Sequence, residues 1–201
     1  MGNGKLGEPA WGIATLFPEQ GNWSAHEYLS LPGNHLVEFS EGFVEVLPMP
    51  TTSHQLVVSA MWQALRTFVR KIHLGLPLVA PLSVQLWPDK FREPDIVFML
   101  KKHESRMGDE FWRGADLVME VVSDDPEDRH RDLVTKRDEY ARAKIPEYWI
   151  VDPKLEEITV LWLKGKKYRV HGIFKMGQIA TSRLLAGFEV AVSEVLVGPS
   201  L

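Results

Sequence analysis

The chain has 201 residues, 45% of them hydrophobic, and is therefore long and apolar enough to bury the core of one domain. It contains no cysteine, which excludes a disulfide framework and a thiolate zinc site. Its net charge of −4 excludes a protein that coats nucleic acid through a generally basic surface, but not an acidic enzyme with a local basic surface. We expect one domain over residues 1–201, in which residues 1–23 form a flexible or loosely packed arm.

No apolar run approaches the roughly 20 residues needed to cross a bilayer, so a membrane protein is not expected. The chain also begins without the apolar stretch of a signal peptide, and we therefore expect a cytoplasmic protein.

The first part of the chain predicts a short helix, a hairpin and a long helix. Ser24-Ala-His-Glu27 fits the capping box of a short helix. Alternating residues at 35–39 and 43–47, separated by Ser-Glu-Gly, predict a β-hairpin. A long helix is expected from residue 51 to about residue 73. Its apolar side is expected to contain Leu56, Ala60, Leu65, Phe68 and Ile72.

Three strands, a helix and a fourth strand are expected next. The strand-like segments are residues 78–87, 94–100 and 116–122, and residues 126–144 are helix-like. Residues 147–151 form the fourth strand. Since strands joined through a helix run parallel in one sheet, we expect the last two strands to be parallel neighbours.

The C-terminal part predicts a second hairpin, formed by residues 157–163 and 167–174 around Gly165. The tail, from about Leu184, is expected to end in a short apolar strand. The order helix, three strands, helix, strand indicates an α/β protein with a mixed sheet.

Lys136 is a cation in the middle of an apolar helical face. Spacings of three and four residues place Arg129, Leu133, Lys136, Tyr140 and Ala143 on one side of the predicted helix. A buried cation costs free energy unless a negative group meets it.

Two carboxylates, Asp95 and Glu120, lie in the strand-like apolar segments upstream. Two buried acids and a buried lysine indicate an active site built around a metal ion. The alternative is a buried network of Lys, Asp and Glu that only organises the core. Tyr140 is interpreted as a packed residue with a satisfied hydroxyl group.

Four segments resemble a known family: Glu93-Pro-Asp-Ile-Val97, residues 115–124, residues 131–141 and Ile145-Pro-Glu-Tyr-Trp-Ile-Val-Asp-Pro153. With the order of elements, they resemble the PD-(D/E)XK nuclease superfamily and, more closely, a bacterial restriction-endonuclease-like family of the Uma type. The resemblance spans residues 24 to 197 approximately. It implies a restriction-endonuclease-like αβββαβ core with a mixed sheet and with N-terminal and C-terminal β-hairpins.

This chain departs from the superfamily pattern at Val122, where the motif lysine is expected. In the family that it resembles, that lysine lies on the following helix, and Lys136 is the matching position. The resemblance therefore implies Asp95, Glu120 and Lys136 as catalytic residues.

The resemblance also implies a metal-dependent endonuclease that hydrolyses phosphodiester bonds in DNA. Asp95, Glu120 and the backbone carbonyl of Val121 would hold the metal ion. Oxygen ligands with retained waters suit Mg²⁺ or Mn²⁺. A homodimer is expected by analogy of fold, because cleavage of two strands needs two sites.

Three further residues are candidates for supporting roles: His54, Glu38 and Gln85. His54 could bind metal or phosphate near a helix N-terminus, but the favoured interpretation is a capping or hydrogen-bonded histidine. Two other functions stay open: a catalytically silent nuclease-fold domain that binds nucleic acid or protein, and a structural or interaction protein with a core acid–lysine network.

Overall fold

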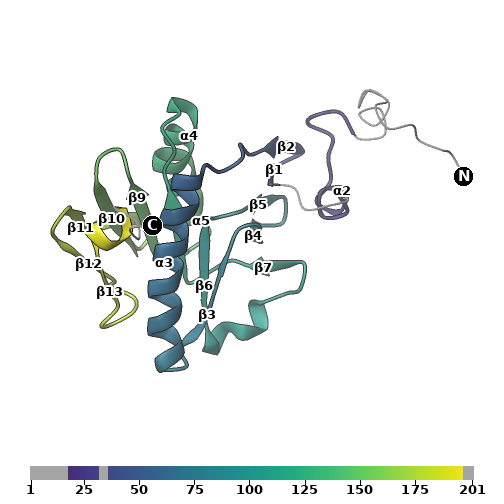
Figure 1. Cartoon of the computed structure of the whole chain (residues 1–201). Coiled ribbons are helices and arrows are strands. Elements are labelled where there is room, and N and C mark those ends of the chain that lie inside the picture. Colours follow the sequence, from purple (N-terminus) through teal and green to yellow (C-terminus); the bar gives the residue numbers. More distant parts are fainter. Residues whose placement is uncertain (1–17, 32–35, 197–201) are drawn as a thin grey trace, which may run out of the picture.

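The computed structural model of the whole chain describes residues 18–31 and 36–196 (Figure 1). Most of the arm expected at residues 1–23 lies outside the described residues, because the description begins at Pro18. Within the described ranges, none of the helices combines the length and the apolar character needed to cross a membrane.

The centre of the fold is a six-stranded sheet. In spatial order its strands are β11 (Lys167–Lys175), β10 (Glu157–Lys164), β9 (Glu147–Asp152), β8 (Leu117–Val121), β6 (Ile96–Leu100) and β3 (Gly75–Val79). β8 and β9 are parallel, as expected for strands joined through a helix, and the other neighbours are antiparallel. The expected mixed sheet and C-terminal hairpin are confirmed.

A second sheet of five strands lies beside the first (Figure 1). Its strands are, in spatial order, β2 (Phe43–Val46), β1 (Val37–Ser40), β5 (Lys90–Arg92), β4 (Ser83–Trp87) and β7 (Phe111–Arg113). The expected N-terminal hairpin is confirmed as β1 and β2.

The prediction of a single strand at residues 78–87 is wrong. The chain forms β3, leaves the central sheet at Ala80-Pro81 and enters the second sheet as β4. Pro81 has no N–H group to donate to a ladder, so a continuous strand through it is disfavoured. The first of the three core strands is therefore β3, followed by β6 and β8, and the αβββαβ order is retained.

The described helical segments are α2 (Ala25–Leu29), α3 (Thr52–Lys71), a 3₁₀ segment (Lys101–Arg106), α4 (Pro126–His130), a π turn (Arg131–Thr135), α5 (Lys136–Arg142) and α6 (Val192–Leu196). Among them, α3 and α6 cover one face of the central sheet and α5 covers the other, whereas α2 packs against the second sheet. The expected helix 126–144 is thus one helical segment interrupted by a π turn. The capping box at Ser24 is present.

The apolar side of α3 differs from the expected one. The side chains that it buries are those of Val57, Val58, Met61, Leu65 and Val69, whereas Ile72 is exposed. The helix ends at Lys71, which leaves Ile72 beyond the face that packs on the sheet.

Two hydrophobic layers enclose the central sheet. On one face, α3 and α6 pack over side chains such as Met119 and Trp149. On the other face, α5 packs over Val118 and Tyr148 together with the second sheet. Because successive side chains of a strand point to opposite faces, Glu120 lies on the same face of β8 as Val118 and is directed toward α5.

The C-terminal tail forms a two-stranded ribbon from β12 (Ile179–Thr181) and β13 (Glu189–Ala191). The expectation that the tail ends in a strand is wrong within the described residues, because α6 follows β13. Val192 and Val195 are both buried, and their spacing of three residues is that of one helical face.

Candidate active site

A cleft of about 1500 Å³ lies where β8 ends and both helical layers meet. Its lining includes Asp95, Glu120, Val121, Lys136 and His54. Five of the seven predicted site positions therefore line the cleft, and a sixth, Glu38, contacts Lys136 from outside the lining. Glu38 and Gln85 do not belong to the lining of this cleft.

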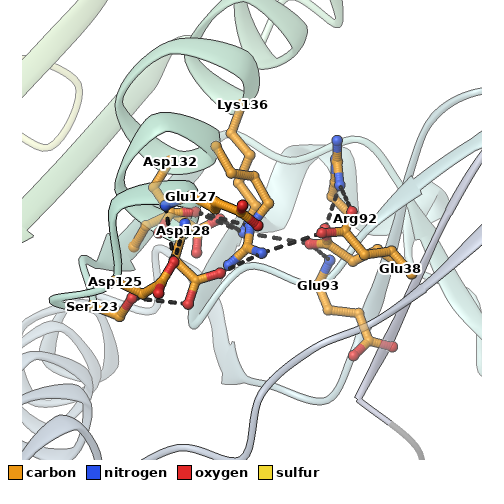
Figure 2. Close-up of polar contacts among 12 residues, drawn as sticks. Glu38, Arg92, Glu93, Ser123, Asp125, Glu127, Asp128, Asp132 and Lys136 are labelled. Carbon is orange, nitrogen blue, oxygen red and sulfur yellow. Dashed lines mark hydrogen bonds and ion pairs between the residues drawn. The ribbon is translucent and has the colours of Figure 1, made fainter.

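Lys136 is buried at the start of α5 and faces three carboxylates, of which Figure 2 labels Asp132 and Glu38. Its Nζ atom lies 3.0 Å from Glu120 Oε1, 3.3 Å from Asp132 Oδ1 and 3.4 Å from Glu38 Oε1. Burial alone lowers the pKa of Lys136, but the negative charges of these carboxylates outweigh it and raise the pKa. Lys136 is therefore held as a charged ammonium group.

Glu120 shares its Oε1 atom between Lys136 and Tyr140. The hydroxyl group of Tyr140 donates a hydrogen bond of 2.6 Å to this oxygen. Burial raises the pKa of Glu120, Lys136 lowers it, and repulsion from Asp132 and Asp95 raises it further, to about 8. One ammonium group does not neutralise all the acids around it, so the cluster favours taking up a proton or another cation.

Asp95 lies immediately before β6 and reaches toward the end of β8. Its Oδ2 atom accepts a hydrogen bond of 2.7 Å from the Val121 N–H group. The Nε2 atom of His54 lies 3.3 Å from the same oxygen. Asp95 is therefore fixed by the backbone of the strand that carries Glu120.

His54 extends from the first turn of α3 into the cleft. The cap of α3 is Thr51, whose side chain accepts a hydrogen bond from the His54 backbone, so the imidazole is free for another role. Burial lowers the pKa of His54, but its hydrogen bond to Asp95 and the charges of Asp95 and Glu120 outweigh this and raise the pKa. The histidine is thus hydrogen-bonded to a predicted metal ligand.

Glu38 connects the site to the second sheet (Figure 2). Its carboxylate accepts a hydrogen bond from the guanidinium group of Arg92, and it also faces Lys136. Burial raises the pKa of Glu38, but Lys136 and Arg92 outweigh it and lower the pKa to about 2. Arg92 also donates to Glu139 of α5 at 2.7 Å, which ties this sheet to the helix that carries Lys136.

Gln85 lies on β4 in the second sheet. Its side-chain amide donates to the Pro88 carbonyl at 3.5 Å. Among the described residues, the structure gives it no contact with Asp95, Glu120 or Lys136, so its position supports the structure of the sheet rather than the cleft.

Two acidic residues of the site were missed by the reasoning from sequence. Asp132 stands four residues before Lys136, a spacing that could have identified it as a partner. Glu93 lines the cleft, and burial together with the charge of Glu38 raises its pKa to about 7. The sequence signal for Glu93 was its position two residues before the predicted metal ligand Asp95.

Within the described residues, no group of three or more His, Asp or Glu side chains is arranged as a metal site. Asp95 and Glu120 nevertheless suit a hard cation, because both are carboxylates that line the same cleft. The negative charge of Asp95 also contributes to the raised pKa of Glu120, and a cation between them would relieve this repulsion. Mg²⁺ is commonly bound by one or two carboxylates with several retained waters, so two such ligands are compatible with it.

The sequence model of the Uma2 family, described as "Putative restriction endonuclease", matches residues 25–193. The chain belongs to this family. A search of the curated proteins found no match.

A solved structure with the same fold is titled "Crystal structure of a putative nuclease belonging to DUF820 from Anabaena variabilis ATCC 29413". It is similar with a TM-score of 0.70 and 15% sequence identity, over 87% of this chain and 98% of that chain. At this identity the likeness shows the fold, and the family assignment supports a nuclease-like function.

Proposed function

We propose that this protein is a metal-dependent endonuclease that hydrolyses phosphodiester bonds in DNA. The observation that carries the proposal is the contact of Lys136 with Glu120, 3.0 Å apart, in the cleft that Asp95 also lines. Membership of a family described as restriction endonucleases agrees with this chemistry.

Asp95, Glu120 and the Val121 carbonyl would hold Mg²⁺ or Mn²⁺. When bound, such an ion lowers the pKa of water and polarises the phosphoryl oxygen. Lys136 carries the positive charge that would orient the attacking water and stabilise the charge that develops on the phosphate. Tyr140 fixes Oε1 of Glu120, and the other oxygen would bind the ion.

A homodimer is part of the proposal. Cleavage of both strands of a duplex needs two active sites, and a twofold pair of chains would present them with matching symmetry. Fold analogy is the support for this assembly.

The test is cleavage of supercoiled plasmid DNA in Mg²⁺ or Mn²⁺ by wild type, Glu120→Gln and Lys136→Met. Loss of a group that stabilises the transition state reduces the rate about 100-fold or more, and we expect at least this for both variants. Glu157→Gln is the matched control, because Glu157 lies on β10 and does not line the cleft. It should cleave as wild type does.

Equal cleavage by all four proteins would reveal a contaminating nuclease and would contradict the proposal. Binding of DNA without cleavage would favour the catalytically silent nuclease-fold domain. If wild type neither binds nor cleaves nucleic acid, the acid–lysine cluster would be interpreted as a core network.

A further inference from the structure

The helical segment that leads into Lys136 contains a π turn, and a side chain of the central sheet binds to it. The Lys136 backbone N–H group donates to the carbonyl of Arg131, five residues earlier, instead of to that of Asp132. The free carbonyl of Asp132 accepts a hydrogen bond of 2.9 Å from the hydroxyl group of Tyr148, a buried residue of β9. A side chain from the sheet therefore satisfies the backbone group that the π turn releases.

The π turn changes which of the residues before Lys136 face the cleft. One extra residue shifts the helical phase by roughly 100°. With Lys136 fixed among its carboxylates, a regular α-helix would turn Arg131, five residues earlier, away from the cleft side, whereas Asp132, four residues earlier, lies on that side in either helix. In the structure, both residues line the cleft.

Arg131 presents a guanidinium group to this cleft. Its Nη1 atom lies 2.7 Å from Asp128 Oδ1 and 3.3 Å from Glu45 Oε1. Its Nε atom is buried, lies 3.6 Å from Asp132 Oδ1 and has no hydrogen-bond partner in the described part of the chain. The Nε donor of the planar fork therefore has no hydrogen bond but is not exposed, so it meets a ligand in the cleft when the guanidinium group turns away from Asp132.

The charge of the cleft makes this donor significant. Carboxylates outnumber the cationic side chains of the lining, so an incoming phosphate is repelled unless a cation meets it. Lys136 is committed to three carboxylates, and Lys154 is an exposed residue of the turn after β9. Arg131 is half-buried in the cleft, and a guanidinium group matches the geometry of phosphate oxygens.

We propose that Arg131 binds a backbone phosphate of the nucleic-acid substrate and that Tyr148 is its positioning residue, acting through the π turn. This inference rests on the proposed function and names a substrate-binding group for it. Arg131 gives up one of its carboxylate contacts when the phosphate enters, and the Nε donor gains a partner.

The test is fluorescence anisotropy with a short fluorescein-labelled DNA duplex, measured in EDTA over a series of salt concentrations. Each phosphate contact contributes about −0.9 to the slope of log K against log salt. Arg131→Gln should reduce the magnitude of this slope by about one and weaken binding roughly 10- to 100-fold, the range for loss of a hydrogen bond to a charged group. Arg131→Lys should keep the slope, because the charge remains.

Arg142→Gln is the charge-matched control. Arg142 lies on α5 and stacks 4.0 Å from the ring centroid of Trp87, and neither residue lines the cleft. Its removal should leave the slope unchanged. A slope that falls equally in Arg142→Gln and Arg131→Gln would overturn the inference.

The role of Tyr148 is tested by comparing Tyr148→Phe with Tyr168→Phe. Both variants lose a buried hydrogen bond from a tyrosine hydroxyl group to a backbone carbonyl, and that of Tyr168 is 2.8 Å long, to Ile145. Tyr148→Phe should give the same slope of log K against log salt as Arg131→Gln. The double variant Arg131→Gln/Tyr148→Phe should have that slope too. Equal effects of the two tyrosine variants, at equal near-ultraviolet circular dichroism, would overturn the positioning role.

Cleavage in Mg²⁺ separates this inference from the proposed function. If wild type cleaves DNA and Arg131→Gln keeps the wild-type salt slope, the inference about Arg131 is wrong while the nuclease remains. If wild type neither binds the duplex nor cleaves it, both are wrong.

Discussion

The Nζ atom of Lys136 lies 3.0 Å from Oε1 of Glu120, and this contact joins α5 to the strand that precedes its helix. Both side chains are buried, so neither charge is solvated by bulk water. The pair is stable because Glu38 and Asp132 also face the ammonium group. Stability and the proposed chemistry consequently depend on the same atoms.

Breaking this pair should destabilise the fold. Removal of one partner from a buried ion pair costs about 3–5 kcal/mol, and we expect this loss of unfolding free energy in Lys136→Met. The double variant Lys136→Met/Glu120→Gln should lose less than the sum of the two single variants, because it no longer buries an unpaired charge. Urea unfolding of wild type, the two single variants and the double variant gives the four unfolding free energies of this double-mutant cycle. If the loss in the double variant equals the sum of the two single losses, Lys136 and Glu120 do not stabilise each other.

Tyr140→Phe should destabilise the protein more than Tyr168→Phe does. The hydroxyl group of Tyr140 donates to a carboxylate at 2.6 Å, whereas that of Tyr168 donates to a neutral carbonyl. Hydrogen bonds to charged groups are worth about 1.5–3 kcal/mol and neutral ones about 1 kcal/mol. Urea unfolding of the two variants above pH 8, where Glu120 with its pKa of about 8 is charged, gives the comparison, and the reverse order there would contradict a charged Glu120.

The stability of the protein should fall as the pH rises through neutrality, and Glu93 should be one cause. Burial and the charge of Glu38 raise the pKa of Glu93 to about 7, from an ordinary value of 4.5. A raised pKa in the folded state contributes stability that is complete below the unfolded value and is lost as the pH rises through the folded value.

The variant Glu93→Gln should therefore have a flatter dependence of unfolding free energy on pH, between about pH 5 and about pH 8. Urea unfolding at several pH values measures this dependence, with Glu157→Gln as the control. If Glu93→Gln and wild type lose stability in parallel, Glu93 does not retain its proton in the folded state.

Glu45→Gln should increase the affinity for DNA. Glu45 lies on β2, its side chain is half-exposed, and it competes for the guanidinium group of Arg131 at 3.3 Å. Exposed ion pairs contribute about 0–1 kcal/mol, so the unfolding free energy should change little while binding tightens a few-fold. Anisotropy with the same labelled duplex measures the affinity. Weaker binding in Glu45→Gln would show that the pair with Arg131 aids binding.

The sequence was sufficient to predict the parts of the fold that depend on periodicity. Leu117 to Val121 alternate between two buried faces, and the helix that follows this strand makes β8 and β9 parallel. The same reasoning identified Lys136 as a cation that needs a counter-ion, because helical spacing alone places it on the buried face.

The parts that were missed depend on tertiary contacts. Residues 78–87 are mostly apolar, and although Pro81 disfavours a continuous strand, the sequence does not show that β3 and β4 pack in two different sheets. The hydroxyl group of Tyr148 binds the Asp132 carbonyl at the π turn from a strand that comes later in the chain, so helical periodicity could not predict that Arg131, five residues before Lys136, lines the same cleft. Glu38 was predicted as a supporting candidate, but its contacts with Lys136 and with Arg92 of β5, 54 positions away, could not be predicted from the sequence.

Calorimetric titration with Mn²⁺ of wild type, Asp95→Asn and Glu157→Gln tests the central claim most directly. Asparagine keeps an oxygen that can accept the Val121 N–H hydrogen bond but removes the charge of the ligand. We predict saturable binding by wild type and Glu157→Gln, and loss of most of the affinity in Asp95→Asn. Absence of binding by wild type, or equal binding by all three proteins, would contradict a metal-dependent nuclease site built on Asp95.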